Sequence, residues 1–295
     1  MDADGGDRPG DFEPREGDLS VAHTLYLYNE DHTLQAEVVP NHGGMIAQLR
    51  LNGREILRVN PGTLEYAPIT AGGVPFLFPF SSKTRDDRYQ LNGREYYMPM
   101  HGLLKNAPFA VKCASENEVT LWTCGHPVWL EANYPFDFRL ELTYRLEGNS
   151  VFLIAEVENR SEDPMPHYLG WHPYFRASDK RRLRLEHSMR THYDYVACRD
   201  EELPDLGDLS KDWDDVLHSP EELSVALENP ADGYAVRIRF DEAFQAMVLC
   251  TWVEGSACVE PWCGIPDSIN NGRFLQWIPA GESVRYTMEM QLSLI

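Results

Sequence analysis

The segment most suited to acid–base chemistry is Gly170-Trp171-His172-Pro173-Tyr174-Phe175, which places one imidazole between aromatic rings and beside a proline. A histidine has an ordinary pKa of about 6.5, so His172 can donate or accept a proton near neutral pH. A buried structural histidine would satisfy the same pattern, since most histidines are not catalytic. The segment therefore marks a candidate acid or base whose partners must come from elsewhere in the chain.

Further segments of the chain combine glycine, proline, histidine and aromatic residues in a similar way. In chain order they are Ala71 to Pro79, Met100-His101-Gly102, Val259-Glu260-Pro261-Trp262 and Ile278 to Glu282. Together with the His172 segment, their order and spacing resemble the aldose 1-epimerase (galactose mutarotase-like) family, and the similarity runs from about residue 20 to the C-terminus. One such piece alone is a weak signal, whereas the ordered set is fairly specific.

This resemblance implies catalytic roles that composition alone cannot assign. His172 matches the family's general acid, Glu260 its general base, and His101 the histidine that helps to hold the ring oxygen. Lys83 stands where the family usually has an arginine, and a lysine offers a point charge instead of a fixed fork of donors. Either Lys83 or Arg85 is therefore expected to contact the substrate, with a solvated hairpin end as the alternative for both.

Two other positions are candidate substrate contacts. Asp214 lies where related proteins carry an aspartate that binds sugar hydroxyls, although the neighbouring Asp215 fits almost as well. Trp262 follows Glu260 closely, and an aromatic face suits the apolar C–H side of a sugar ring. Ordinary packing of Trp262 in the core is the competing interpretation.

The chemistry implied is the interconversion of α and β anomers of a hexose or related sugar. Opening the ring requires a proton to leave O1 and another to reach the ring oxygen O5, and a carboxylate and an imidazolium supply both transfers. The scheme needs no metal and no cofactor. It requires Glu260 to be ionised while His172 is protonated, which ordinary pKa values of about 4.3 and 6.5 allow, and it predicts a bell-shaped rate profile.

Three alternatives to a simple aldose epimerase remain open. A hexose 6-phosphate or another modified sugar would find cations to bind its anionic group: Lys83, Arg85, Arg88 and Lys105. Thr70-Ala71, where phosphate-specific relatives commonly have an arginine, argues against it. A non-catalytic carbohydrate-binding protein would not need both His172 and Glu260. A glycosidase would need a second carboxylate, for which only Asp214 or Asp215 is available.

The elements that must position these residues are β-strands. Apolar residues alternate with polar ones from Phe136 to Leu146, and again in Tyr234–Phe240 and Val284–Leu294, as in half-buried antiparallel strands. Glu147 to Ser150 turns the chain into the apolar run Val151–Val157, which predicts a hairpin. Together with the resemblance, this predicts an all-β fold, a large antiparallel β-sandwich of the galactose mutarotase-like supersandwich type.

The chain is expected to form a single domain over residues 19–295, preceded by an acidic disordered tail at 1–18. Asn52-Gly53 and Asn92-Gly93 predict tight hairpin turns, because both residue types tolerate positive φ. No amphipathic helix longer than two turns is expected. The acidic stretch from Arg199 to Glu222 interrupts the strand pattern and predicts a long surface loop, which would either form the rim of a cleft or be plain decoration.

Composition limits the partners. With 26 basic and 47 acidic residues the net charge is −21, which disfavours nucleic acid and anionic membranes as partners. The six cysteines show no paired spacing, which favours a reducing compartment. No apolar run approaches the ~20 residues that cross a bilayer. We therefore expect a soluble cytoplasmic protein with a small-molecule sugar as its partner, and the oligomeric state is left open.

Overall fold

The computed structural model describes residues 24–59 and 72–295. The predicted tail at 1–18 and the Thr70-Ala71 pair lie outside these residues. Within them, the fold consists of antiparallel sheets with two short helices, α1 (Pro127–Ala132) and α2 (Ser268–Asn271), and two 3₁₀ turns at Arg85–Asp87 and Lys180–Arg182. The prediction of an all-β antiparallel sandwich is confirmed.

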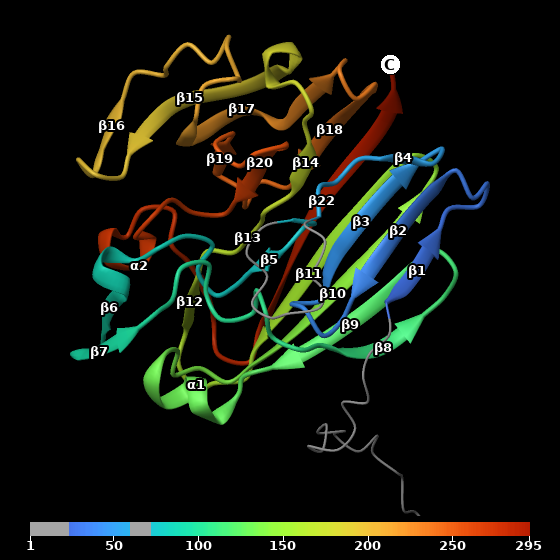
Figure 1. Ribbon diagram of the computed structural model, residues 1–295. Helices are drawn as coiled ribbons and strands as arrows, with labels where there is room; N and C mark the ends of the chain where they lie inside the picture. The colour runs from blue at the N-terminus through green and yellow to red at the C-terminus, as the bar shows by residue number, and fades with distance from the viewer. Residues whose placement is uncertain (1–23, 60–71) are drawn as a thin grey trace, which may run out of the picture.

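A large sheet of 14 strands runs through the molecule (Figure 1). Its main path follows the order β5 (Phe76–Leu77), β13 (Gly170–Trp171), β20 (Ser256–Trp262), β19 (Ala246–Cys250), β17 (Asp214–Asn229), β18 (Tyr234–Phe240), β22 (Ser283–Leu294), β11 (Ser150–Asn159), β10 (Phe138–Glu147), β9 (Glu118–Cys124) and β8 (Ala110–Ala114). Outside this path, β14 (Tyr174–Arg176) pairs with β20, β15 (Arg184–Asp194) with β17, and β16 (Arg199–Glu201) with β15.

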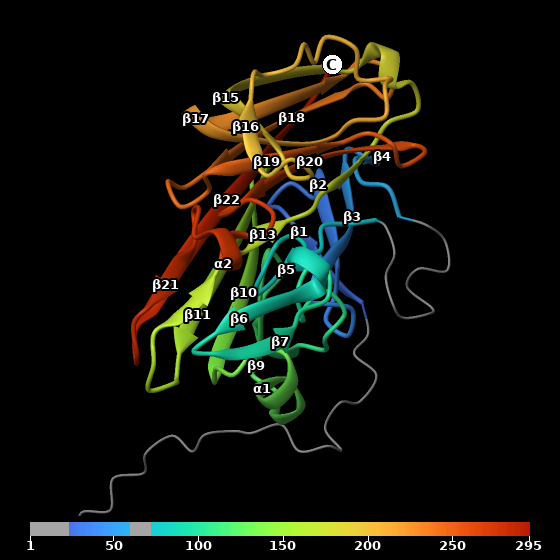
Figure 2. The same cartoon turned by 90° about the vertical axis from the view of Figure 1, so that its left-hand side faces the viewer.

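Smaller sheets complete the architecture. Four strands form the second large layer: β1 (Leu25–Tyr28), β2 (Leu34–Val39), β3 (Met45–Leu51) and β4 (Arg54–Glu55). Two pairs stand apart, β6 (Arg88–Leu91) with β7 (Arg94–Tyr97) and β12 (Met165–His167) with β21 (Gln276–Ile278). Figure 1 shows β1–β4 beside β9–β11, and Figure 2 shows β15–β20 as the upper part of the molecule above β10 and β11.

The predicted hairpin around Glu147 to Ser150 is present as β10 and β11, with Phe138 opposite Asn159 and Glu147 opposite Ser150. Alternate residues of β10 are buried because one face of the strand packs on the core. The apolar face belongs to one continuous cluster whose members extend along the chain from Leu27 to Leu292. The boundaries of a single domain over 19–295 stay a prediction.

Turn chemistry follows the sequence closely. Asn52 and Gly53 have φ values of 49° and 77° between β3 and β4, and Asn92 and Gly93 have 50° and 77° between β6 and β7. These are the positive values that two-residue hairpin turns require. Both predicted turns are confirmed.

The expectation of one long loop over 199–222 is wrong at both ends. Arg199–Glu201 forms β16, and β17 begins at Asp214 and continues through the region predicted to be loop. Its acidic residues fit in a strand because they lie at its exposed or partly exposed positions, at the start, in the middle and at Glu228, while Val216 and Leu217 are buried. Near Pro220 the pairing with β15 shifts register, so a bulge accommodates the proline.

Residues 24–59 and 72–295 contain no helix that is both long and apolar enough to span a membrane. All six cysteines lie within the described residues, and none of them forms a disulfide there.

Candidate functional site

Strand β20 presents the central carboxylate. Its residues alternate between the two faces of the sheet, so Cys258, Glu260 and Trp262 share one face. All three are buried, and Glu260 is 1% exposed. A carboxylate so far from water in the middle of a buried strand requires an explanation, because charged groups are seldom fully buried without a partner.

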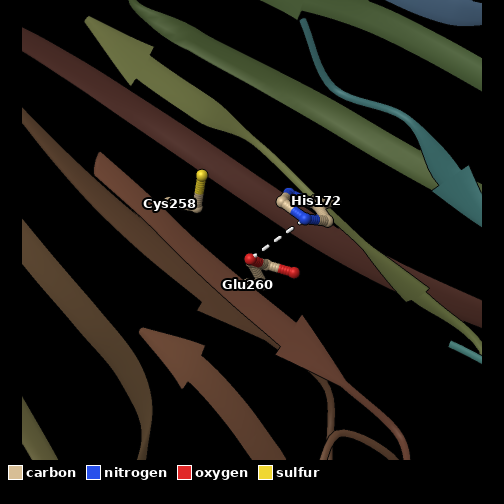
Figure 3. Close-up of side chains that lie close together, drawn as sticks. All are labelled: His172, Cys258 and Glu260. Atoms are coloured by element: carbon tan, nitrogen blue, oxygen red, sulfur yellow. Dashed lines mark ion pairs between the residues drawn. The ribbon is translucent and has the colours of Figure 1, made fainter. Parts of the chain in front are cut away.

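His172 is held opposite Glu260 by two short strands. Gly170 in β13 pairs with Trp262, and Tyr174 in β14 pairs with Cys258, so the residue midway between them falls opposite Glu260. The His172 backbone N–H donates to the Pro75 carbonyl at 3.0 Å and fixes the bend between the two strands. As a result, His172 Nε2 lies 3.2 Å from Glu260 Oε1 (Figure 3).

Gly170 makes this arrangement possible. A Cβ at this position would lie 2.3 Å from Cδ1 of the Trp262 indole, closer than any real contact. The indole therefore packs directly on the glycine backbone, and strands β13 and β20 can approach each other. Any larger residue at 170 would displace either Trp262 or the His172 segment.

The His172 ring is oriented by an aromatic neighbour. It stacks on the Tyr174 ring with centroids 4.3 Å apart and an interplanar angle of 6°. The Tyr174 hydroxyl also lies 3.2 Å from His172 Nε2, so this nitrogen contacts both a phenol and a carboxylate. His172 Nδ1 has no hydrogen-bond partner among the described residues.

His101 enters the same site from another part of the chain. Gly102, at φ 77°, passes so close to the Phe78 carbonyl that a Cβ there would lie 2.3 Å from its oxygen. This close approach directs His101 inward, where its Nδ1 lies 2.8 Å from the Ser81 carbonyl oxygen. Its ring meets those of His172 and Trp262 edge to face, at centroid distances of 5.4 and 6.2 Å.

Burial controls the protonation of the site. Loss of solvation raises the pKa of Glu260 well above its usual value, helped by Cys250 and Asp214 and opposed by the ammonium of Lys105. Loss of solvation, with the nearby His101 and Lys105, lowers the pKa of His172 well below 6.5. Burial likewise lowers the pKa of His101 to about 4.

These directions correct the expectation that ordinary pKa values place a carboxylate beside an imidazolium. In the ligand-free site, desolvation disfavours both charges, so a single proton shared by the pair resides on Glu260 and leaves His172 neutral. The sequence could not reveal this, because the shifts come from burial by strands distant in the chain. The 3.2 Å contact lets the proton move between the two groups.

The face on which Glu260 lies also decides between the two candidate aspartates. Val216 in β17 pairs with Val248 in β19, which pairs with Glu260, and Asp214 precedes Val216 by two residues. Asp214 therefore shares the face of Glu260. Asp215 points the other way and lies 2.8 Å from His192 Nε2. The structure brings Asp214, and not Asp215, to the side of the candidate site.

Lys83 and Arg85 lie along a groove of about 380 Å³, within the usual range for small-molecule sites, whose lining includes neither Glu260 nor His172. The Lys83 ammonium lies 4.0 Å from the centre of the Tyr195 ring. It also opposes the rise in the Asp214 pKa caused by partial burial and by Asp215. Arg85 instead interacts with Cys198 and Asp267. Lys83 is thus the cation on the Asp214 side, and Arg85 lies farther out.

Three residues near the pair were not predicted to act there. Tyr174 orients His172, Cys258 lies beside Glu260, and Lys105 acts electrostatically on both His172 and Glu260. Period-two spacing in the segment Cys258-Val259-Glu260 was a usable signal for Cys258. The sequence predicted Lys105 only as a phosphate ligand, because the three loop residues between it and His101 give no periodicity that predicts its direction.

Comparison with known proteins agrees with the fold. The family model described as aldose 1-epimerase matches residues 24–291. Protein LacX of Lactococcus lactis is 26% identical over 285 residues, covering 86% of this chain and 92% of LacX. Among solved structures, the Slr1438 protein from Synechocystis has a TM-score of 0.86 at 24% identity, covering 92% of this chain and 96% of that one. A putative aldose 1-epimerase from Escherichia coli K12 has a TM-score of 0.77 at 19% identity, covering 92% and 99%.

The antiparallel sandwich and its family match define a carbohydrate isomerase. The chain belongs to the aldose 1-epimerase family. It is accordingly an isomerase with a small-molecule sugar as substrate.

Proposed function

We propose that this protein interconverts the α and β anomers of an unphosphorylated aldose, with Glu260 and His172 as its proton-transfer pair. One observation carries the proposal: two buried ionisable groups that are far apart in the sequence meet, with His172 Nε2 3.2 Å from Glu260 Oε1. Glu260 Oε2 and His172 Nδ1 have no hydrogen-bond partner among the described residues, so both retain capacity for ligand hydroxyls.

The reaction uses the one proton that the pair holds. The Glu260 carboxylate takes the proton from O1 while the His172 imidazolium delivers its proton to O5, and the C1–O5 bond breaks to give the open-chain aldehyde. Rotation about C1–C2 turns the other face of the carbonyl toward O5. The two groups then run in reverse and close the opposite anomer.

Sugar binding promotes the charged form of the pair. Hydrogen bonds from sugar hydroxyls stabilise a carboxylate, and the Lys105 ammonium already favours the ionised form of Glu260. The hydroxyl hydrogen bonds move the shared proton from Glu260 to His172, whereas the Lys105 ammonium lowers the pKa of both groups. His101, Asp214 and Lys83 are the side chains that we assign to hydroxyl contacts, with Trp262 against the ring.

The groove containing Lys83 and Arg85 supports a second candidate substrate, a sugar with an anionic substituent. However, the groove is also lined by Asp86, Asp87 and Asp267, and Arg85 already contacts Asp267. These carboxylates would repel a phosphate dianion. We therefore favour the neutral sugar.

Exchange spectroscopy by NMR tests the proposal, because it measures anomer interconversion at equilibrium without a coupled enzyme. Glucose, galactose and glucose 6-phosphate are compared for the wild type, Glu260→Gln and His172→Asn. Exposed Glu254→Gln and His32→Asn provide matched controls. We expect either site variant to lose about 10²–10⁴-fold in rate and the controls to keep wild-type rates. Unchanged exchange in both site variants would refute the assignment.

A further inference from the structure

Glu260 and His172 are joined by a third donor that the isomerase mechanism does not use. Cys258 lies two residues before Glu260, so both side chains project from the same face of β20. Figure 3 shows them on one side of the strand with His172 facing them. One ligand atom from each of the three residues lies within 4.8 Å of the other two, and all three residues are buried.

Thiolate, imidazole and carboxylate form a donor set suited to Zn²⁺. In a tetrahedral zinc site with bonds of 2.0–2.3 Å, neighbouring ligand atoms are about 3.3–3.7 Å apart. The contact between Glu260 Oε1 and His172 Nε2 is already 3.2 Å. From 4.8 Å, the Cys258 sulfur would need to move only about 1 Å, which a small side-chain rotation allows.

The surroundings also favour a metal here over an accidental cluster. His172 Nδ1 and Glu260 Oε2 have no hydrogen-bond partner among the described residues, so a metal would compete with the Tyr174 hydroxyl at His172 Nε2 but with no hydrogen bond at those two atoms. Cys258 is opposite Cys250 in the β19–β20 register, and the two thiols interact, so the nearest polar neighbour of the sulfur is another soft donor. Three protein ligands leave the fourth zinc position open.

We propose that Cys258, His172 and Glu260 form a binding site for a soft divalent cation of the zinc class, and that the cation inhibits the enzyme by occupying both proton-carrying atoms. Zinc bonds to Glu260 and His172 replace the shared proton, so neither group can transfer a proton to or from the sugar. Metal binding is independent of the proposed function, whereas inhibition rests on it.

The test uses the full chain, freed of metal with a chelator. Co²⁺ serves as the spectroscopic probe, because ligation by a thiolate gives a charge-transfer band in the near ultraviolet. Exposed Cys113 and Cys198 are first replaced by serine to remove surface thiols. We expect this background to bind one Co²⁺ with the thiolate band and to release it to Zn²⁺. Loss of the band in this background would overturn the proposal, because the metal would then have been on the surface.

Substitutions of the proposed metal-binding residues show whether the metal binds at Cys258. Cys258→Ser should abolish the band and weaken Zn²⁺ binding by more than the 10–100-fold that loss of an outer-shell partner costs. Cys263→Ala removes another buried thiol from the same part of the chain and should keep the band. If Cys258→Ser fails to fold, Glu260→Gln gives the same test through a second ligand, with weaker affinity as the expected result. Unchanged affinity in a folded ligand variant would overturn the site.

Anomer exchange measured with and without Zn²⁺ distinguishes a failure of the proposed metal site from a failure of the proposed function. With Zn²⁺ bound at Cys258, anomer exchange should stop, and a high sugar concentration should compete with the metal. Zinc that binds as described and leaves exchange unchanged would uphold the metal site while refuting Glu260 and His172 as the catalytic pair. Zinc that inhibits equally in wild type and Cys258→Ser would refute the metal site and leave the catalytic proposal intact.

Discussion

Two parts of the same large sheet are built on opposite principles. Along β10, every second residue is apolar and buried, and the polar residues between them face away from the core. In β20 all seven residues are buried, and one of them is a glutamate. The first region uses burial for stability alone. The second buries a carboxylate that would be more stable in water, which is the usual sign that a site's chemistry is maintained against stability.

The largest effect expected from this comparison is the loss of anomer exchange when Glu260 and His172 are replaced. In the double variant Glu260→Gln/His172→Asn, we expect exchange to fall little further than in either single variant, whose loss is about 10²–10⁴-fold. The reason is that the two groups act as one proton-holding unit, so removing either one disables it. Anomer exchange rates for the four proteins complete a double-mutant cycle. Additive losses would mean that the residues act independently.

The opposite result is expected in the β10–β11 region. Leu142 is fully buried and lies between Leu121 and Ala155 in the sheet. Leu142→Ala should lower the free energy of unfolding by about 2–5 kcal/mol through lost burial and a cavity. The remaining folded protein should exchange anomers at the wild-type rate. Urea denaturation measures the first quantity, and partly exposed Leu223→Ala, expected within about 0.5 kcal/mol of wild type, is the control.

The pH dependence of the rate should identify which group is responsible for which limb. Because burial lowers the pKa of His172 and raises that of Glu260, the pair holds one proton between these two values. The acidic limb then belongs to His172 and lies below its usual 6.5, and the alkaline limb belongs to Glu260.

The kcat/KM values that remain in the two site variants, measured across pH, distinguish this assignment from the one that ordinary pKa values would give. His172→Asn should lose the acidic limb, and Glu260→Gln should lose the alkaline limb. With ordinary pKa values the variants would lose the opposite limbs. Lys105, whose own pKa is lowered by burial, is checked with Lys105→Met. Because the Lys105 ammonium lowers the pKa of both His172 and Glu260, this variant should keep both limbs and move them to higher pH.

Stability should show the cost of burying Glu260. Its pKa is higher in the folded protein than in the unfolded chain, so the wild type loses stability as pH rises from the unfolded value of about 4.3 toward the folded one. Glu260→Gln cannot ionise and avoids this loss. Its stability relative to wild type should therefore increase with pH over that interval and then level off. Chemical denaturation at several pH values measures it, with the exposed Glu254→Gln as the matched substitution outside the site.

Sequence and structure agree best where a pattern is local. The hairpin of β10 and β11, the strands β18 and β22 and the two Asn-Gly turns follow from period-two alternation and from residues that tolerate positive φ. The acidic stretch was misread because composition outweighed alternation. Val216 and Leu217 are a buried apolar pair within a strand whose acidic residues occupy its exposed or partly exposed positions.

The site was predictable only in part. The resemblance to a family suggested His172, Glu260 and His101, and the structure brings these three together. Their protonation was not predictable, because desolvation depends on which distant strands cover them. The choice between Asp214 and Asp215 likewise needed the register of β17 against β19 and of β19 against β20. A one-residue shift would have exchanged their faces.

The smallest effect on kcat/KM is expected from substituting these two aspartates, and each variant serves as the control for the other. Asp214→Asn removes a charged acceptor on the Glu260 face, so we expect kcat/KM to fall about tenfold, the equivalent of about 1.4 kcal/mol for one hydrogen bond to a charged group. The Asp214 charge also helps to raise the Glu260 pKa, so its removal should move the alkaline limb to lower pH. Asp215→Asn loses the contact with His192 on the other face and a charge that raises the Asp214 pKa, but Asp215 is not among the groups that shift the Glu260 pKa. It should therefore change the rate and the limb less than Asp214→Asn does. If Asp215→Asn were the more damaging variant, the register argument that places Asp214 beside the catalytic pair would be wrong.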